Sequence, residues 1–384
     1  MHIHHAASGT AWPPVQFAGW RLWDSGVAWP QLEPERGKWN FALLDRYCQL
    51  AAEHHVEIVL TLGLTPTWAS ARPDEPSAYG KGNAAEPRNL ADWQEYVRAV
   101  ATRYRGCIHT YEVWNEPNMR TDFSGTVDTM LQLSRAAYET LKSVDTANVV
   151  LSPSATTDTG LRWLDSFLAQ GGCRYSDVIA YHFYVTPNPP EAMIPVIQKV
   201  QRSLRARKCD GKPLWNTESG WAQPKQFSSE AEAAAYLMRT YVVNWLMGVQ
   251  HCYWYAWDNH NWSTLNLTNF AGSQITAAGA SFGTIRQWML GAGLRSCTRE
   301  SSGLWICQFD RKESTSWILW STGSTSIFRI PSSWQVTQVL DWTGAAALLS
   351  DHLTVTSSPI LLTSAEARTI SSNSTTGRSE ASHS

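Results

Sequence analysis

The sequence predicts an α/β fold, a (β/α)8 TIM barrel followed by a C-terminal all-β sandwich domain. Over residues 1–293, short apolar runs alternate with segments of helical periodicity, which is typical of a parallel sheet covered by helices. From residue 294 to residue 363 the helical periodicity disappears, and short β-rich runs separated by turn-forming residues follow. We therefore expect a barrel domain at residues 1–293, a small β-sandwich at 294–363 and a disordered Ser/Thr-rich tail at 364–384.

The expected barrel strands are eight short apolar runs. Several are apolar nearly throughout, as in a sheet that is buried on both faces. The runs are residues 2–4, 20–23, 56–62, 110–114, 149–151, 178–181, 213–215 and 251–256. Eight strands that alternate with helices favour closure into a barrel. The first run starts almost at the beginning of the chain, so this strand has little lead-in.

The segments between most of these runs have apolar residues spaced as on one face of a helix. The expected helices are residues 41–53, 90–104, 127–144, 161–169, 192–206, 229–247 and 278–290. The link between the first two runs contains Pro13 and Pro14, and we expect it to be a loop. The expected strands of the second domain are residues 304–309, 316–320, 326–330, 336–340 and 354–362.

Composition excludes some partners and favours one. Charged residues make up 17% of the chain and the formal net charge is −2, so we expect no nucleic-acid partner. No apolar stretch approaches the ~20 residues that a membrane span needs. The chain has 21 Trp, and flat aromatic rings suit the apolar faces of sugar rings, so we expect a carbohydrate partner.

The N-terminus, Met1–His5, shows no signal peptide, and a truncated or misassigned start is the alternative. Localisation therefore stays open: cytoplasmic for the sequence as given, with secretion or a periplasmic location as the alternative. The oligomeric state stays open as well. The seven cysteines have no C-x-x-C spacing, and we expect most of them to be small buried side chains. Disulfides between Cys297 and Cys307, and between Cys173 and Cys209, are the alternatives.

Two carboxylates stand where apolar runs end, and they are the main functional signal. Glu116 lies in Trp-Asn-Glu-Pro at 114–117, and Glu218 lies in Trp-Asn-Thr-Glu-Ser-Gly at 215–220. A parallel barrel builds its active site at the C-terminal ends of its strands. Cleavage of a glycosidic bond with retention uses one carboxylic acid as acid/base and one carboxylate as nucleophile, about 5 Å apart. We expect Glu116 to be the acid/base and Glu218 the nucleophile. This chemistry needs no metal and no cofactor, and we expect none.

Several stretches resemble a known family. Tyr111–Asn118 resembles the fourth-strand signature of clan A glycoside hydrolases, and Pro213–Glu218 resembles their seventh-strand nucleophile segment. The chain is similar to family 39-like members, and the resemblance extends to Trp20–Asp24, Glu33–Asn40 and Leu62–Ala69. It implies a (β/α)8 barrel followed by a β-sandwich, and a retaining O-glycoside hydrolase that acts on an oligo- or polysaccharide. The sugar, its anomeric configuration and endo or exo action stay open.

Supporting residues follow from the same reasoning. Arg21 is expected to keep Glu218 ionised, and Asn115 to bind a sugar 2-hydroxyl. The resemblance implies that His182 and Tyr184 contact the nucleophile and the sugar, and that Trp257 forms a platform under the sugar. The remaining candidate substrate-binding residues are His4, Trp68 and Trp221.

The supporting residues have structural alternatives: a surface ion pair for Arg21, a wall side chain for His182 and Tyr184, and a core side chain for Trp257. Glu112, on the same strand as Glu116, is expected to be a buried structural residue or part of a salt bridge.

The mechanism requires different protonation of the two carboxyl groups. We expect the pKa of Glu116 to be raised toward ~6 while Glu218 stays ionised. Two alternatives share the same residues: a transglycosylase, and a catalytically inactive carbohydrate-binding barrel.

Overall fold

The structure, a computed structural model, describes residues 1–270, 272–311 and 314–364. Its chain divides into two compact units. One comprises Met1–Trp288 with Trp342–Gly344, and the other comprises Met289–Asp341 and the chain from Ala345 onward. Apart from Ser364, the tail that we expected at 364–384 lies outside the described residues.

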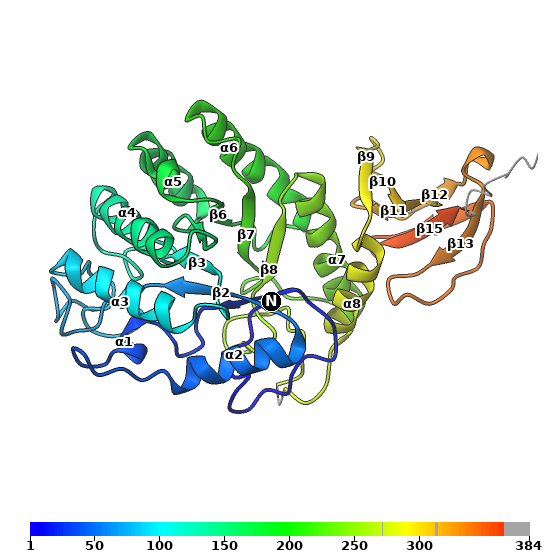
Figure 1. The fold of residues 1–384 in the computed structure, drawn as a ribbon. Helices are drawn as coiled ribbons and strands as arrows, with labels where there is room; N and C mark the ends of the chain where they lie inside the picture. The colour runs from blue at the N-terminus through cyan, green and yellow to red at the C-terminus, as the bar shows by residue number, and fades with distance from the viewer. Residues whose placement is uncertain (271, 312–313, 365–384) are drawn as a thin grey trace, which may run out of the picture. The chain divides into compact units, whose positions relative to one another are not determined.

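The first unit contains two parallel sheets of four strands each (Figure 1). One sheet has the order β1-β2-β3-β4, with bounds Gly19–Leu22, Glu57–Leu62, Thr110–Val113 and Val149–Leu151. The other has the order β5-β6-β7-β8, with bounds Ala155–Thr156, Ile179–His182, Leu214–Ser219 and His251–Trp254. These strands agree with the predicted runs, except that β5 was not predicted.

Backbone contacts run between the two sheets at both of their edges. At one edge Leu151 forms a parallel bridge with Val178. At the other edge the N–H of Arg21 donates to the carbonyl of Met1, and the N–H of His2 donates to the carbonyl of Trp254, each at 3.0 Å. The sheets also share a core, because buried side chains of β2, β4, β6 and β8 pack together. These are Val59, Leu151, Val178, Ala180 and Tyr253.

The predicted strand at residues 2–4 is wrong as a regular strand. His2 pairs with the chain on both sides of Ala256, since its carbonyl also accepts from the N–H of Trp257 at 2.9 Å. A tight turn then ends the pairing, because the carbonyl of His5 accepts from the N–H groups of Ser8, Gly9 and Thr10. The segment therefore contributes backbone hydrogen bonds without forming a strand.

Helices follow most strands and lie outside them (Figure 1). Their bounds are α1 Trp29–Leu32, α2 Ala42–His54, α3 Leu90–Arg103, α4 Val127–Val144, α5 Thr157–Ala169, α6 Met193–Ala206, α7 Glu230–Leu246 and α8 Ala277–Met289. Side-chain caps fix two of the starts: Thr126 accepts from the N–H of Thr129 before α4, and Ser229 accepts from the N–H of Glu232 before α7. Short 3-10 turns occupy Gly172–Tyr175 (η1) and Pro190–Ala192 (η2). Among the described helices, none is both long and apolar enough to cross a membrane.

The second unit is antiparallel. A five-stranded sheet has the order β13-β15-β11-β10-β9, with bounds Val336–Leu340, Ile360–Ser364, Ser314–Ser321, Leu304–Arg311 and Gly293–Arg299. A two-stranded sheet pairs β12 with β14, with bounds Ser326–Arg329 and His352–Val355, and a 3-10 turn, η3, spans Ser332–Trp334. Both sheets contribute to one core, in which Leu353 and Val355 of β14 pack with Leu319 and Leu362.

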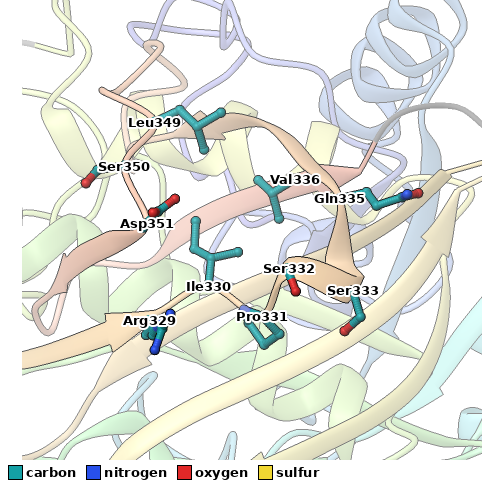
Figure 2. A pocket seen from close by; sticks show the side chains of 10 residues that line it. All are labelled: Arg329, Ile330, Pro331, Ser332, Ser333, Gln335, Val336, Leu349, Ser350 and Asp351. Atoms are coloured by element: carbon teal, nitrogen blue, oxygen red, sulfur yellow. The ribbon is translucent and has the colours of Figure 1, made fainter.

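Two expectations for this unit are wrong. The run at 354–362 is divided into β14 and β15, since Pro359 lies between them and Pro cannot donate to a ladder. The strand β9 was missed because most of its residues are exposed, so it has no apolar pattern. Beside η3, a hollow of about 830 Å³ is lined by side chains that include Arg329, Asp351 and Leu349 (Figure 2).

Three disulfides correct the expectation that most cysteines are unpaired. They join Cys48 to Cys107, Cys173 to Cys209, and Cys297 to Cys307, so both pairs weighed as alternatives are present. Cys252 is the free cysteine. The pair that the sequence did not suggest joins α2 to the loop before β3, across 59 residues, and depends on a tertiary contact.

Candidate active site

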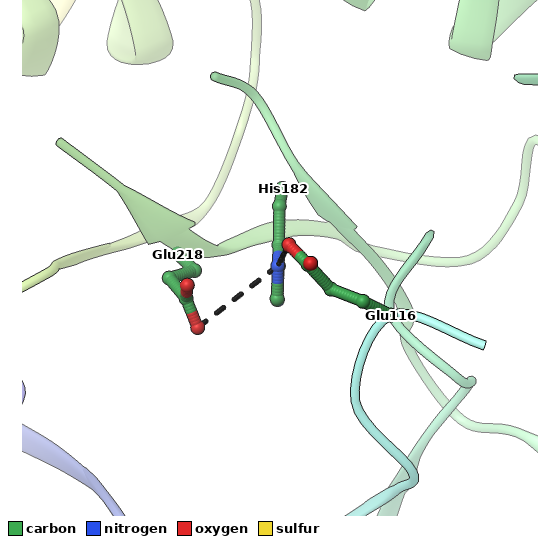
Figure 3. A group of neighbouring side chains, drawn as sticks. All are labelled: Glu116, His182 and Glu218. Carbon is green, nitrogen blue, oxygen red and sulfur yellow. Dashed lines mark hydrogen bonds and ion pairs between the residues drawn. The ribbon is translucent and has the colours of Figure 1, made fainter. Parts of the chain in front are cut away.

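Glu116 and Glu218 lie together, although they belong to different sheets. Glu116 follows β3, and Glu218 stands near the C-terminal end of β7. One oxygen of each carboxylate and a ring nitrogen of His182 lie within 4.8 Å of one another, with the imidazole between the two carboxylates (Figure 3). This separation fits the ~5 Å typical of retaining glycosidases and falls short of the ~6.5–9.5 Å that inverting enzymes need.

The backbone around Glu116 is unusual. Glu116 has φ 41° and Trp114 has φ 66°, both in the left-handed region that non-glycine residues seldom adopt. A residue before proline is normally extended. Glu116 precedes Pro117 and is nevertheless left-handed, so it departs from this preference. Backbone hydrogen bonds fix this conformation, since the N–H of Glu116 donates to Ser154 and its carbonyl accepts from Met119. Such local strain is often found where a side chain must be aimed at a reaction centre.

Two donors hold the carboxylate of Glu218. The hydroxyl of Tyr184 donates to Oε1 at 2.7 Å, and Nη1 of Arg21 donates to Oε2 at 2.8 Å. Register between β6 and β7 pairs His182 with Glu218, and Nδ1 of His182 lies 2.8 Å from Oε1 of Glu116. The imidazole thus contacts one carboxylate directly and lies 3.9 Å from the other.

Arg21 is the centre of a buried network. Besides Glu218, it donates through Nε to Glu112 at 2.7 Å and through Nη2 to Oδ1 of Asn115 at 2.8 Å. Thr61, paired with Glu112 across β2 and β3, donates to the same Glu112 oxygen at 2.9 Å. The expectation that Glu112 takes part in a salt bridge is confirmed. The network orients the Asn115 amide, because its oxygen accepts from Arg21 and its nitrogen donates to Oδ1 of Asp122 at 3.4 Å.

Burial changes the protonation of the site. Desolvation raises the pKa of Glu116 to about 7, against the opposing charge of Arg21. Desolvation also raises the pKa of Glu218 to about 7, although the charge of Arg21 and the hydrogen bond from Tyr184 oppose this rise. The expectation that Glu218 simply stays ionised is therefore wrong for the free protein, since the loss of hydration outweighs its donors. Desolvation lowers the pKa of His182 to about 4, so its ring is neutral at pH 7.

Among the residues that the structure describes, the other predicted aromatic residues form no hydrogen bond with the two carboxylates. Trp257 and Trp221 are buried, and the indole N–H of Trp221 donates to the carbonyl of Asn188. Trp68 donates to the carbonyl of Glu33 and is covered by the guanidinium of Arg36. His4 is buried, and its ring lies 5.1 Å from that of Tyr255.

The sequence analysis did not predict four residues at the site, which are Asp24, Tyr79, Tyr255 and Trp262. The ring of Trp262 lies 5.2 Å from that of Tyr184 and 5.3 Å from that of Tyr255, and Trp262 is 42% exposed. The hydroxyl of Tyr255 donates to Asp24 at 2.6 Å, and Trp23 donates to the hydroxyl of Tyr79 at 2.9 Å. Asp24 and Tyr255 lie in stretches that the sequence analysis had singled out, so their position in the sequence could have indicated a role at the site. Trp262 lies on a loop, where no sequence pattern indicated that it would lie at the site.

Glu116, His182 and Glu218 are spaced closely enough to share a cation. Both oxygens of Glu218, however, already accept from donors, one of which is the guanidinium of Arg21. A cation at this point would have to replace those bonds or lie beside a positive charge. The donor set therefore suits an anionic carboxylate better than a metal ligand.

Parallel strands with covering helices, and paired carboxylates at strand ends, define a class of carbohydrate-active α/β proteins. The family model of glycosyl hydrolases family 39 matches residues 14–257. The chain belongs to this family.

Three similar proteins share between 16% and 24% identity with the chain. A β-xylosidase of Geobacillus stearothermophilus is 24% identical over 229 residues, which cover 52% of this chain and 45% of the relative. The match thus spans about half the length of that curated relative. A family 39 glycoside hydrolase from Bacteroides cellulosilyticus WH2 has a similar structure, with a TM-score of 0.73 and 18% identity over 90% of this chain and 75% of that chain. A family 39 β-xylosidase from Caulobacter crescentus has a TM-score of 0.67 and 16% identity over 90% of this chain and 88% of that chain. These two likenesses concern the fold.

Proposed function

We propose that the protein is a retaining O-glycoside hydrolase with β-xylosidase-like activity, with Glu116 as acid/base and Glu218 as nucleophile. The observation that carries the proposal is the spacing of the carboxylate oxygens, within 4.8 Å of each other. The two parallel sheets are proposed to be the halves of one (β/α)8 barrel, contained in residues 1–293. Their contacts at both edges and their shared core support this.

In the first step, the Glu218 carboxylate attacks the anomeric carbon while Glu116 gives its proton to the leaving oxygen. A glycosyl ester on Glu218 and a free alcohol result. In the second step, Glu116 takes a proton from water, and the water oxygen replaces Glu218 at the anomeric carbon. The pKa of about 7 for Glu116 suits both roles, since the group is neither fully protonated nor fully ionised near neutral pH.

The surrounding residues have roles that fit these steps. Arg21 and Tyr184 hold the nucleophile by one oxygen each, so its orientation toward the anomeric carbon is fixed. The Asn115 amide nitrogen donates one hydrogen to Asp122, and its second hydrogen is proposed to bind a 2-hydroxyl of the sugar while Arg21 holds the amide oxygen. Such contacts strengthen in the transition state of retaining glycosidases.

The test compares wild type with Glu116→Gln and Glu218→Ala on 4-nitrophenyl β-D-xyloside and on xylo-oligosaccharides. Glu218→Ala is expected to lose turnover on both. Glu116→Gln is expected to retain activity on the nitrophenyl glycoside, whose leaving group needs little protonation, and to lose activity on the oligosaccharides. The exposed Glu139→Gln on α4 is the matched control and is expected to behave as wild type. Residual turnover by Glu218→Ala at wild-type rates would overturn the assignment.

A further inference from the structure

A cavity of about 240 Å³ opens where β1 ends. Thr61 lines it and also donates to Glu112 in the network around Arg21. Asp24 lines it too, and its charge acts on Glu116, where it helps to raise the pKa of that group. The cavity therefore lies beside the catalytic pair. Among the residues that line it, Asp24 is the only charged one.

The Asp24 carboxylate is held in place and remains open to a ligand. Asp24 is exposed and has φ 55°, a conformation that Asp and Asn tolerate better than most residues. The Tyr255 hydroxyl donates to Oδ2, and Asn259 in turn donates to that hydroxyl at 2.8 Å. In the part of the chain that the structure describes, Oδ1 has no hydrogen-bond partner. Tyr79, which also lines the cavity, accepts from Trp23 and so has a hydroxyl proton to donate.

The cavity lies on the side of the nucleophile. The ring of Tyr255, whose hydroxyl donates to Asp24, lies 5.3 Å from the ring of Trp262. The ring of Trp262 in turn lies 5.2 Å from that of Tyr184, whose hydroxyl donates to Glu218. Since Glu218 is placed to attack the anomeric carbon, groups around it contact the sugar on the non-leaving side, the glycone.

Positive charge is scarce at this point. Arg21 is completely buried, and its bonds go to Glu112, Glu218 and Asn115. Desolvation lowers the pKa of His182 and of His4, so neither ring carries a charge at pH 7. A glycone that carried its own carboxylate would face Asp24 and Glu218 without a free cation among the residues that line the cavity.

We propose that Asp24 determines the specificity of the glycone site: it accepts hydrogen bonds from the hydroxyls of a neutral sugar ring and excludes sugars that carry a carboxylate. This inference rests on the proposed function, because it assigns the cavity to the glycone of the same reaction. A charged acceptor makes hydrogen bonds to hydroxyls that are stronger than those of a neutral amide.

The test uses 4-nitrophenyl β-D-xyloside, β-D-glucoside and β-D-glucuronide with wild type, Asp24→Asn and Glu139→Gln. For wild type, kcat/KM on the glucuronide is expected to be at least ~100-fold below that on the glucoside. In Asp24→Asn, kcat/KM on the neutral substrates is expected to fall by ~10–100-fold. The ratio of kcat/KM on the glucoside to kcat/KM on the glucuronide is expected to fall by ~10-fold or more. Glu139→Gln should match wild type, and thermal unfolding verifies that each variant is folded.

Equal rates of wild type on glucoside and glucuronide would overturn the proposal. So would an unchanged preference in folded Asp24→Asn. A second readout needs no turnover: the Trp fluorescence of Glu218→Ala is titrated with xylotriose and with trigalacturonate. Only xylotriose is expected to bind. Introducing Asp24→Asn into the Glu218→Ala protein is expected to weaken the affinity for xylotriose by ~10-fold or more.

If no substrate is hydrolysed but this pattern of binding holds, the proposed hydrolysis fails, and Asp24 is left with a role in selecting neutral sugars as ligands. If hydrolysis is found and the pattern is absent, only the role of Asp24 fails. Absence of both hydrolysis and xylotriose binding overturns both.

Discussion

Arg21 and Glu112 form an ion pair in which both side chains are completely buried, and the same guanidinium bonds the candidate nucleophile Glu218. One positive charge is thus shared by two carboxylates. Glu112 touches neither the cavity nor Glu116, so it acts on Glu218 through Arg21 and is a positioning residue.

Glu112→Gln keeps the shape of the side chain and removes its charge. The variant is expected to lose about 3 kcal/mol of unfolding free energy, because it breaks a buried ion pair and leaves Arg21 partly uncompensated. Arg21 then acts mainly on Glu218, whose pKa should fall, so the acidic limb of the kcat/KM profile should move to lower pH. Urea denaturation and a pH–rate profile measure the two effects. An acidic limb that stays in place while stability falls would show a purely structural role.

The activity profile of wild type is expected to be a narrow bell centred near pH 7. In the proposed first step Glu116 is protonated and Glu218 is ionised, and burial raises the pKa of each group to about 7. The two groups titrate as a coupled pair, so the limbs belong to the pair. The measurement is kcat/KM of a neutral aryl glycoside from pH 4 to pH 10 in steps, and a broad plateau across that range would contradict the expectation.

The same raised pKa values predict how stability depends on pH. Both carboxyl groups bind protons more tightly in the folded than in the unfolded protein. Their contribution to stability is therefore largest below the unfolded pKa, falls as pH rises toward about 7 and is constant above it. Glu218→Gln should accordingly raise the unfolding free energy by about 2 kcal/mol at pH 8 and by much less at pH 4. Thermal or urea unfolding at the two pH values provides the test, and an equal effect at both would count against it.

Trp262 and Trp257 allow a comparison of an exposed and a buried indole. Trp262→Ala removes an exposed ring in contact with Tyr184 and Tyr255, and is expected to raise KM by ~10-fold with little loss of stability. Trp257→Ala empties a buried position and is expected to cost about 3–5 kcal/mol of unfolding free energy. Kinetics and urea unfolding of both variants distinguish sugar binding from core packing. A raised KM with little loss of stability in Trp257→Ala, and not in Trp262→Ala, would support Trp257 as the sugar platform.

Much of the fold was predictable because its signals are local. The period of apolar residues placed α4 at its observed bounds, and the end of an apolar run placed Glu116 and Glu218 at strand ends that meet. Features that depend on tertiary contacts could not be predicted from the sequence. The contact of Trp262 with Tyr184 joins residues far apart in the chain, as does the Cys48–Cys107 pair.

The protonation of Glu218 was misjudged for a related reason. The sequence showed a cationic partner, Arg21, but could not show how completely water is excluded around the carboxylate. In the structure that exclusion is the largest influence on its pKa.

The two carboxylates stand on different sheets, and this has a consequence for how the protein loses activity. If either four-stranded half melted alone, the other would keep its own strands and helices, and circular dichroism would still report an ordered protein. The proposed reaction centre, however, would no longer exist, since neither sheet holds both Glu116 and Glu218. Catalysis is therefore a more sensitive gauge of intact assembly than any spectroscopic measure of helix content.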